Sequence, residues 1–240
     1  MPDALRLRAH LLQQFELAEN DPSVIDQGAL TVVVVGGGPT GVEMAGALHE
    51  LFKHVLVHDF PGIDISRARV VLLEASRKHA LEILGKRGVE VRLGQALERA
   101  TPDEVKLKDG TVIPTKTLVW GAGVRANPLA DLLGLEQTRG GRILVGDDLS
   151  VGGRPEVLVV GDLAGAGDGK GGLLPQVAQP AIQEARHAAL QIQHTLDGTE
   201  RTGFTYKDKG IMATIGRNAA VTELPSGARF KGVLAWYMWL

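Results

Sequence analysis

The sequence predicts an α/β fold in which a parallel sheet of doubly wound type is followed by a smaller, less regular second part. Three observations predict this class. Apolar, β-branched runs of the kind buried in parallel strands occur at residues 31–36, 69–75 and 117–123. A helical pattern follows the first run directly, over residues 40–54. Glycine makes up 31 of the 240 residues, nearly twice its usual share, which indicates loops where the backbone approaches a ligand closely.

The composition excludes several classes of function. With 44% hydrophobic and 22% charged residues, the chain is typical of an ordinary globular protein. Its net charge of −2 argues against a nucleic-acid-binding surface, so we expect no nucleic-acid partner. The absence of cysteine excludes a disulfide framework, an iron–sulfur cluster and thiol redox chemistry, and no metal site is predicted. Any electron transfer must therefore use a bound organic cofactor.

Residues 1–30 are predicted to form an amphipathic helix and a lead-in to the sheet. Leu5, Leu12 and Phe15 recur at helical spacing while charged residues occupy the other face. Residues 31–123 then alternate strand and helix patterns in the βαβαβ order of a nucleotide-binding domain. After the first helix we expect a loose connection at 55–66, strands at 69–75 and 89–93, a helix at 76–87 and a closing strand at 117–123.

Residues 97–114 interrupt this alternation and predict a three-stranded antiparallel meander. The stretch EVKLKDGTVI alternates apolar and polar residues around Asp109-Gly110, a dipeptide typical of hairpin turns. Residues 124–229 contain fewer strand patterns, in GRILVGDDL and EVLVVGDLAG, and a helix from about residue 180 to 196. Because residues 124–240 have too few strands to close a domain by themselves, we expect them to belong to a larger one.

The loop between the first strand and the first helix points to a dinucleotide. Gly36-x-Gly38-x-x-Gly41 follows a strand and opens a helix, where glycines permit a tight turn and the close approach of a pyrophosphate. The free amides and the positive end of the helix dipole attract the phosphates. We therefore predict a Rossmann-like dinucleotide-binding domain over residues 31–123, with Gly37 in the same loop.

Glu74, at the end of the second strand, is the predicted ribose ligand. A carboxylate there accepts hydrogen bonds from the ribose hydroxyls of NADH and repels the additional phosphate of NADPH. Glu74 lies 33 residues beyond Gly41 instead of the usual ~20, and the excess matches the loose connection at 55–66. Because Arg77 lies nearby, NADPH is not excluded as the cofactor. The alternative interpretation of Glu74 is an ordinary surface glutamate at the end of a strand.

Five segments, taken in order, resemble one family. The chain contains VVVVGGGPTGVEMAGAL, LVWGAGVRANPLADLLGL, EVLVVGDLAG, LPQVAQPAIQEARHAA and YKDKGIMATIGR. These segments resemble the type II NADH dehydrogenases, flavoproteins that pass electrons from NADH through FAD to a membrane quinone without pumping protons. The resemblance covers essentially the whole chain, and it implies both cofactors, NADH and FAD.

The resemblance also implies which residues contact the cofactors. Gly36, Gly37, Gly38 and Gly41 would hold the NADH pyrophosphate, and Glu74 the adenosine ribose. On the nicotinamide side, the resemblance implies contacts from Gly121 and Gly123. Asp162, which ends a strand in a Gly-Asp pair, would bind the ribityl chain of FAD. Without the resemblance, Asp162 is equally well interpreted as a helix N-cap.

Four further residues are implied at the quinone end of the flavin. Gln179 and Gln183 match a pair of glutamines that can donate hydrogen bonds to quinone carbonyls without adding charge. Glu43, in the first turn of the first Rossmann helix, would deliver a proton to the reduced quinone, and Lys209 would lie near the flavin. By themselves, the two glutamines are more typical of a solvated helix face, and Glu43 of simple dipole complementation.

Both ends of the chain depart from the family pattern. An N-terminal FAD domain with its own glycine motif is missing, so we expect residues 124–229 to be only part of a second, FAD-binding domain. Residues 230–240, FKGVLAWYMWL, end a basic stretch in aromatic residues and predict the start of a membrane-interface segment. We therefore expect a chain truncated at both ends and, in the family, a peripheral enzyme on the cytoplasmic side of the membrane. A homodimer is left open.

We weigh three alternative functions against the quinone oxidoreductase. The chain could be an NAD-binding module without turnover, because the FAD domain is missing, or a flavin reductase that serves a soluble acceptor. A soluble NAD-dependent dehydrogenase finds no support, because no substrate-side His or Tyr–Lys pair is apparent.

Overall fold

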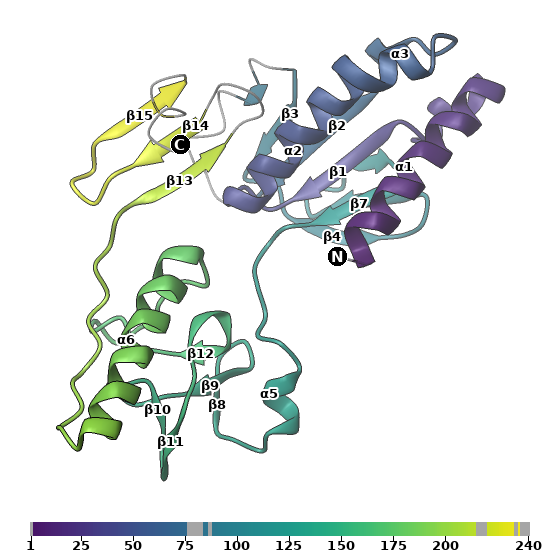
Figure 1. Ribbon diagram of the computed structural model, residues 1–240. Coiled ribbons are helices and arrows are strands. Elements are labelled where there is room, and N and C mark those ends of the chain that lie inside the picture. Colours follow the sequence, from purple (N-terminus) through teal and green to yellow (C-terminus); the bar gives the residue numbers. More distant parts are fainter. Residues whose placement is uncertain (1, 76–83, 86–87, 215–219, 233–234, 236–240) are drawn as a thin grey trace. The chain divides into compact units, whose positions relative to one another are not determined.

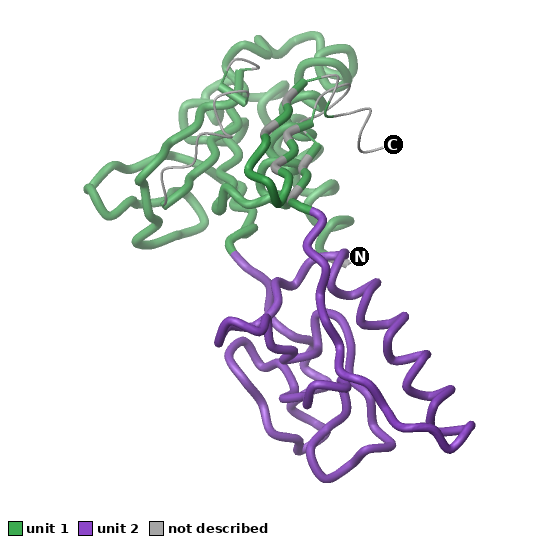
Figure 2. The backbone as a smooth tube through the Cα atoms, turned by 90° about the vertical axis from the view of Figure 1, so that its left-hand side faces the viewer, with its two compact units in different colours: residues 1–122, 210–240 green, residues 123–209 purple. Residues whose placement is uncertain are grey.

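The computed structural model forms two compact units, each described here by itself (Figures 1 and 2). Unit 1 comprises residues 1–122 and 210–240, and unit 2 comprises residues 123–209. Among the described residues, no helix is both long and apolar enough to cross a lipid bilayer. The structure describes residues 2–75, 84–85, 88–214, 220–232 and 235.

Unit 1 is built around a four-stranded parallel sheet. Its strands, in spatial order, are β3 (Glu90–Leu93), β2 (Arg69–Glu74), β1 (Thr31–Val35) and β7 (Thr117–Trp120). Val33 of β1 pairs with Val71 of β2 on one side and with Leu118 of β7 on the other. Every residue of β1 is buried, because β1 is a central strand of a sheet covered on both faces. The predicted parallel sheet is confirmed.

Helices α1 (Pro2–Asn20) and α2 (Pro39–Leu51) cover one face of this sheet (Figure 1). Phe15 of α1 and Leu48 of α2 share an apolar core with Val34 of β1. Leu5 was expected on the apolar face of the first helix, but it is 65% exposed. The 3₁₀-helix η1 (Pro22–Ile25), capped by the Asp21 side chain, leads from α1 into β1.

The connection between α2 and β2 is more helical than predicted. The π-helix η2 (Phe52–Leu56) and the short helix α3 (Val57–Asp59) continue α2, and the 3₁₀-helix η3 (Ile65–Arg67) precedes β2. The ring of Phe52 lies 5.1 Å from that of Phe15 between centroids, and Phe52 and Leu56 are buried in the core that they share with α1. The predicted loose connection at 55–66 is therefore wrong for its first residues.

A three-stranded antiparallel meander covers the opposite face of the parallel sheet. Val105 and Ile113 of the meander pack against Val33 of β1. At the predicted hairpin turn, the Thr111 amide donates to the Asp109 carboxylate at 2.9 Å. Between them, Gly110 has a φ of +88°, a conformation that suits glycine. The predicted meander is confirmed. Its strands are β4 (Leu97–Ala100), β5 (Glu104–Leu107) and β6 (Val112–Pro114).

A second antiparallel sheet completes unit 1, with β13 packed beside α2. The predicted helix at 76–87 falls outside the described residues except for residues 84–85. Of the predicted interface segment 230–240, residues 233–234 and 236–240 also lie outside them. The strands of this sheet are β13 (Ile211–Thr214), β14 (Ala220–Glu223) and β15 (Arg229–Gly232).

Unit 2 contains small sheets and one long helix, α6 (Ala178–Asp197). The predicted helix at about 180–196 is thus present, and Gly198, with a φ of +67°, ends it in the left-handed conformation. That residues 124–229 form part of an FAD-binding domain stays a prediction. The remaining elements are α5 (Leu129–Leu132), η5 (Gly161–Leu163), β8 (Gln137–Thr138), β9 (Arg142–Leu144), β10 (Ser150–Val151), β11 (Arg154–Leu158) and β12 (Ala164–Gly165).

Candidate functional site

The turn from β1 into α2 can be built only with glycine at two of its positions. Gly36 has a φ of +109°, and a Cβ atom there would lie 2.7 Å from the backbone oxygen of Gly121. At Gly41, a Cβ atom would lie 1.8 Å from the backbone oxygen of Gly36. These contacts are the tight turn and the close helix–strand packing that the glycine motif predicts.

The same turn is open where a ligand would approach it. Gly38 is the N-cap of α2, and no atom of the described residues lies within 4 Å of the position of a Cβ atom there. Among the residues that the structure describes, no side chain caps this end of α2, and Pro39 occupies its first position. Because the first amides of a helix have no partner within the helix, this end attracts an anionic group such as a phosphate.

Glu74 lies directly beside this glycine loop. Its Oε2 atom accepts a hydrogen bond of 2.6 Å from the Gly37 amide, which links the end of β2 to the loop after β1. A Cβ atom at Gly37 would lie 2.6 Å from the same carboxylate oxygen. The structure therefore brings the predicted ribose ligand and the predicted pyrophosphate loop together, at the edge where doubly wound sheets bind nucleotides.

Gly121, which follows β7, also lies beside the end of β1. Its amide donates to the backbone oxygen of Val35 at 2.8 Å, so the residue that follows β7 lies against the residue that ends β1. Gly123, with a φ of +115°, is the first residue of unit 2. Trp120, the last residue of β7, is 62% exposed at this end of the sheet, and it lies in the segment LVWGAGVRANPLADLLGL.

Glu43 has a partner that the sequence did not reveal. Its Oε1 atom accepts hydrogen bonds from the amide and the hydroxyl of Thr214, at 3.2 and 3.4 Å. These bonds connect the first turns of α2 to the end of β13, across 171 residues of sequence. Thr214 lies in the segment YKDKGIMATIGR, so the family motif was the only signal that pointed toward it.

In unit 2, the predicted flavin residue Asp162 lies in the 3₁₀-helix η5 with its side chain exposed. The N-cap of η5 is Val160, so interpreting Asp162 as an N-cap is wrong. Gly161, with a φ of +69°, precedes it. The backbone oxygen of Asp162 accepts a hydrogen bond of 2.8 Å from the Gln176 side chain.

Glu184 of α6 is a buried carboxylate that the sequence analysis missed. Its Oε2 atom accepts a hydrogen bond of 2.5 Å from the Gly161 amide, and its side chain lies on the buried face of α6. Burial raises the pKa of Glu184, and this effect exceeds the opposing effects of the Gly161 amide and the Arg142 guanidinium. The sequence signal that could have revealed Glu184 is its helical spacing from Pro180 and Ala188, which lie on the same buried face of α6.

The two glutamines behave differently. The Gln183 amide group forms a reciprocal pair with the backbone of Lys207, donating to its oxygen and accepting from its amide, both at 3.0 Å. Gln183 is therefore not simply solvated. Gln179 is half-buried and is the second residue of α6, which begins at Ala178. Lys209, the last residue of unit 2, is exposed.

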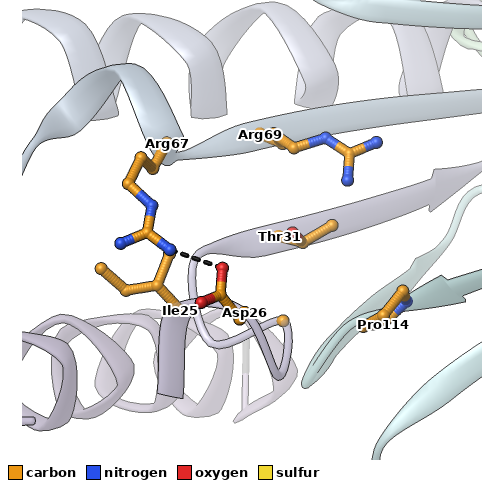
Figure 3. A pocket seen from close by; sticks show the side chains of 7 residues that line it. Ile25, Asp26, Thr31, Arg67, Arg69 and Pro114 are labelled. Atoms are coloured by element: carbon orange, nitrogen blue, oxygen red, sulfur yellow. Dashed lines mark hydrogen bonds and ion pairs between the residues drawn. The ribbon is translucent and has the colours of Figure 1, made fainter. Parts of the chain in front are cut away.

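A cavity in unit 1 lies at the other end of the parallel sheet (Figure 3). Thr31 and Arg69, which begin β1 and β2, line it together with Arg67, whose guanidinium bonds the Asp26 carboxylate at 2.5 Å. Ligands of doubly wound folds bind at the opposite edge, beyond the carboxyl ends of the strands. We therefore do not assign this cavity to the nucleotide.

Comparison with known proteins points to one family. The sequence profile of the pyridine nucleotide-disulphide oxidoreductases matches residues 3–190. The chain is 42% identical to the type II NADH:quinone oxidoreductase Ndh of Mycobacterium tuberculosis and 40% identical to NdhA of the same organism, covering 99% of this chain and 55% of each relative. It thus spans about half the length of these relatives. The resemblance to type II NADH dehydrogenases is confirmed.

Solved structures agree on the fold. NDH2 from Plasmodium falciparum in complex with NADH superposes with a TM-score of 0.80 at 18% identity, over 99% of this chain and 67% of that chain. CoADR-RHD from Bacillus anthracis superposes with a TM-score of 0.59 at 23% identity, over 81% of this chain and 34% of that chain. At these identities the likeness concerns the fold, and the predicted α/β class is confirmed.

Proposed function

This chain belongs to the pyridine nucleotide-disulphide oxidoreductase family, and we propose that it provides the NADH-binding half of a type II NADH:quinone oxidoreductase. The observation that carries the proposal is the glycine loop of unit 1. There Gly36 and Gly41 permit the turn, Gly38 leaves it open, and Glu74 lies against Gly37. The identity of 42% to a relative named as a type II NADH:quinone oxidoreductase supports the choice of reaction.

In the proposed function, NADH binds at the carboxyl ends of β1 and β2. The pyrophosphate lies on the amides that begin α2, and the adenosine ribose donates hydrogen bonds to Glu74. By the family resemblance, Gly121 and Gly123 would contribute to the nicotinamide side. The carboxylate of Glu74 also favours NADH over NADPH, because it repels a 2′-phosphate.

The residues of unit 2 fit part of a flavin site. Hydrogen bonds to the Glu184 and Gln176 side chains hold the backbone of the turn that carries Asp162. The exposed carboxylate of Asp162 can accept hydrogen bonds from ribityl hydroxyls. FAD, when bound, would accept a hydride from NADH and release two electrons to the next acceptor. Because the chain has no cysteine, its own residues offer no thiol to relay those electrons.

At the quinone end we propose roles for four residues. Gln179 and Gln183 can present neutral amide donors to quinone carbonyls. Glu43 would hold or deliver a proton, with its carboxylate oriented by Thr214, and Lys209 would supply positive charge near the flavin. Contact with a lipid surface through the C-terminal residues, a peripheral position on the cytoplasmic side of the membrane, and a homodimer belong to the same proposal.

A second candidate function is an NADH-binding module without turnover. It is favoured by the glycine loop and Glu74, which supply the proposed pyrophosphate and ribose contacts within unit 1 alone. A flavin reductase for a soluble acceptor shares the NADH and FAD sites, and only the choice of acceptor distinguishes it from the quinone oxidoreductase.

The test is a visible absorption spectrum of the purified chain with added FAD, before and after anaerobic addition of NADH. We expect protein-bound yellow absorbance that NADH bleaches and a quinone restores. A colourless protein that still binds NADH would support the module without turnover. Reoxidation by a soluble acceptor but not by a quinone would favour the flavin reductase, and failure to bind NADH would contradict all three functions.

A further inference from the structure

Two side chains from outside the turn hold the backbone of η5 in unit 2. The Gly161 amide donates to the Glu184 carboxylate at 2.5 Å, and the backbone oxygen of Asp162 accepts from the Gln176 amide at 2.8 Å. Two consecutive residues are thus fixed through their main chain. The side chain of Asp162 remains exposed and is not needed to hold the turn.

Glu184 is an unusual residue to use for this contact, because a buried carboxylate is costly unless it is hydrogen-bonded. Its side chain belongs to a residue that is 2% exposed, on the face of α6 that packs toward η5. The charged groups that act on it are the Arg142 guanidinium of β9 and the Asp162 carboxylate of η5. A charge-assisted hydrogen bond to an amide is stronger than a neutral one, so this acceptor holds the turn firmly.

The amide that Glu184 holds belongs to a residue whose conformation requires control. Gly161 has a φ of +69°, and a Cβ atom there would lie 3.5 Å from the Cβ atom of Ala181 on α6. Glycine populates many conformations when nothing restrains it. The bond to Glu184 holds Gly161 in the conformation that lets η5 follow β11. In this conformation the Asp162 side chain is exposed.

We propose that Glu184 is a positioning residue for FAD: it fixes Gly161 and thereby presents the Asp162 carboxylate to the ribityl chain. This inference rests on the proposed function, because it assigns Asp162 to the flavin. Glu184 would not itself touch the cofactor. The burial that raises the pKa of Glu184 predicts that the bond weakens at a less acidic pH than an ordinary glutamate would require.

The first test follows the Gly161 amide by ¹⁵N NMR in the full 240-residue chain. We expect its chemical shift to titrate with Glu184, and Glu184→Gln to abolish the titration while an amide oxygen still accepts the bond. Glu184→Ala should speed hydrogen exchange at Gly161 at least about tenfold, since a bond to a charged acceptor is lost. Glu156→Gln, at an exposed position on β11, is the matched control and should change neither property.

The second test measures binding of FAD by quenching of its fluorescence. We expect Glu184→Ala to weaken FAD binding at least about tenfold and Glu184→Gln to restore it to within about threefold of the unaltered chain. NADH binding, for which we propose pyrophosphate and ribose contacts in unit 1, should be the same in all variants and shows that unit 1 is folded. The far-ultraviolet circular dichroism spectrum, to which α6 contributes, should also be unchanged.

Each outcome decides between the two proposals. Equal FAD affinity in the unaltered chain and in Glu184→Ala would overturn the positioning role, as would a Gly161 shift that still titrates in Glu184→Gln. The latter comparison remains decisive if Glu184→Ala does not fold. If the unaltered chain binds NADH but not FAD, the flavin part of the proposed function fails, and the role of Glu184 toward FAD fails with it.

Discussion

At the scale of single residues, the proposed nucleotide site depends on glycines, whose lack of a side chain lets backbone atoms approach one another closely. Gly36 and Gly41 bring the end of β1, the start of α2 and the residue after β7 within van der Waals distance. Glu74 then contacts the loop through the Gly37 amide at 2.6 Å. The carboxylate therefore has two tasks, since it holds the loop in the structure and binds the ribose in the proposed function.

Substituting Glu74 separates these two tasks. Glu74→Gln keeps an oxygen that can accept from Gly37 but removes the negative charge, so we expect it to reduce the preference for NADH over NADPH about tenfold. Glu74→Ala removes both and should weaken NADH binding by roughly 1–3 kcal/mol. Fluorescence titrations with both nucleotides measure these changes.

Glu16→Gln, on the exposed face of α1, is the control and should leave both affinities unchanged. A general disturbance of the loop would weaken NADH and NADPH equally, whereas loss of a ribose ligand changes their ratio. An unchanged ratio in Glu74→Gln would contradict the ribose role.

At the scale of secondary-structure elements, the segment after α6 returns along unit 2 and is held by polar contacts. The Phe204 amide donates to the backbone oxygen of Asp147 at 2.7 Å, and Arg201 bonds the Asp148 carboxylate at 3.0 Å. Gln191, fully buried on α6, pairs with the amide and the hydroxyl of Thr202. The Gln183–Lys207 pair continues this attachment along the helix.

Asp148 makes this attachment depend on pH. Burial acts to raise the pKa of Asp148, but the hydrogen bonds from Ser150 and Arg201 outweigh it and leave the pKa below its ordinary value. A carboxyl group with a lowered pKa in the folded state stabilises the protein above its unfolded pKa, and this stabilisation is lost as the pH falls through the folded pKa.

Asp148→Asn should therefore lower the free energy of unfolding by about 1 kcal/mol at pH 7, with a difference that shrinks below about pH 4. Urea unfolding at a series of pH values measures it. Asp59→Asn, at an exposed position in unit 1, is the matched control and should leave the free energy of unfolding at pH 7 unchanged. A stability difference for Asp148→Asn that stays constant from pH 7 down to acid would contradict the assignment.

At the scale of the whole molecule, the basic C-terminal stretch is the feature that concerns a membrane. Residues 201–240 contain six Lys or Arg and two Asp or Glu, although the whole chain has a net charge of −2. The strand β15 (Arg229–Gly232) pairs with β14, so a deletion that begins at residue 230 would damage unit 1. Residues 233–240 can be removed without cutting that pairing.

A chain that ends at Gly232 should bind anionic liposomes less than the full chain does, because it lacks both tryptophans and the tyrosine of residues 233–240. Sedimentation with liposomes at low and high salt measures the difference, and binding by the full chain should weaken with salt. NADH affinity serves as the control for unit 1 and should not change. Equal sedimentation of both chains would refute the interface assignment.

The sequence by itself determined the features that depend on neighbouring residues. The runs TVVVV and RVVLLE become β1 and β2 because buried parallel strands need continuous apolar residues. The meander follows from alternation around Asp109-Gly110, and the glycine loop from backbone sterics at Gly36 and Gly41. Each of these signals spans only a few residues.

Tertiary structure alone decided which polar groups meet. The bond from Thr214 to Glu43 spans 171 residues, and the bond from Gly161 to Glu184 spans 23 residues. The helical extension at Phe52–Leu56 likewise depends on Phe15 of another helix. Such contacts leave no period in the sequence, because they are selected by burial and hydrogen-bond satisfaction after the chain has folded, and not by the local conformation of either partner.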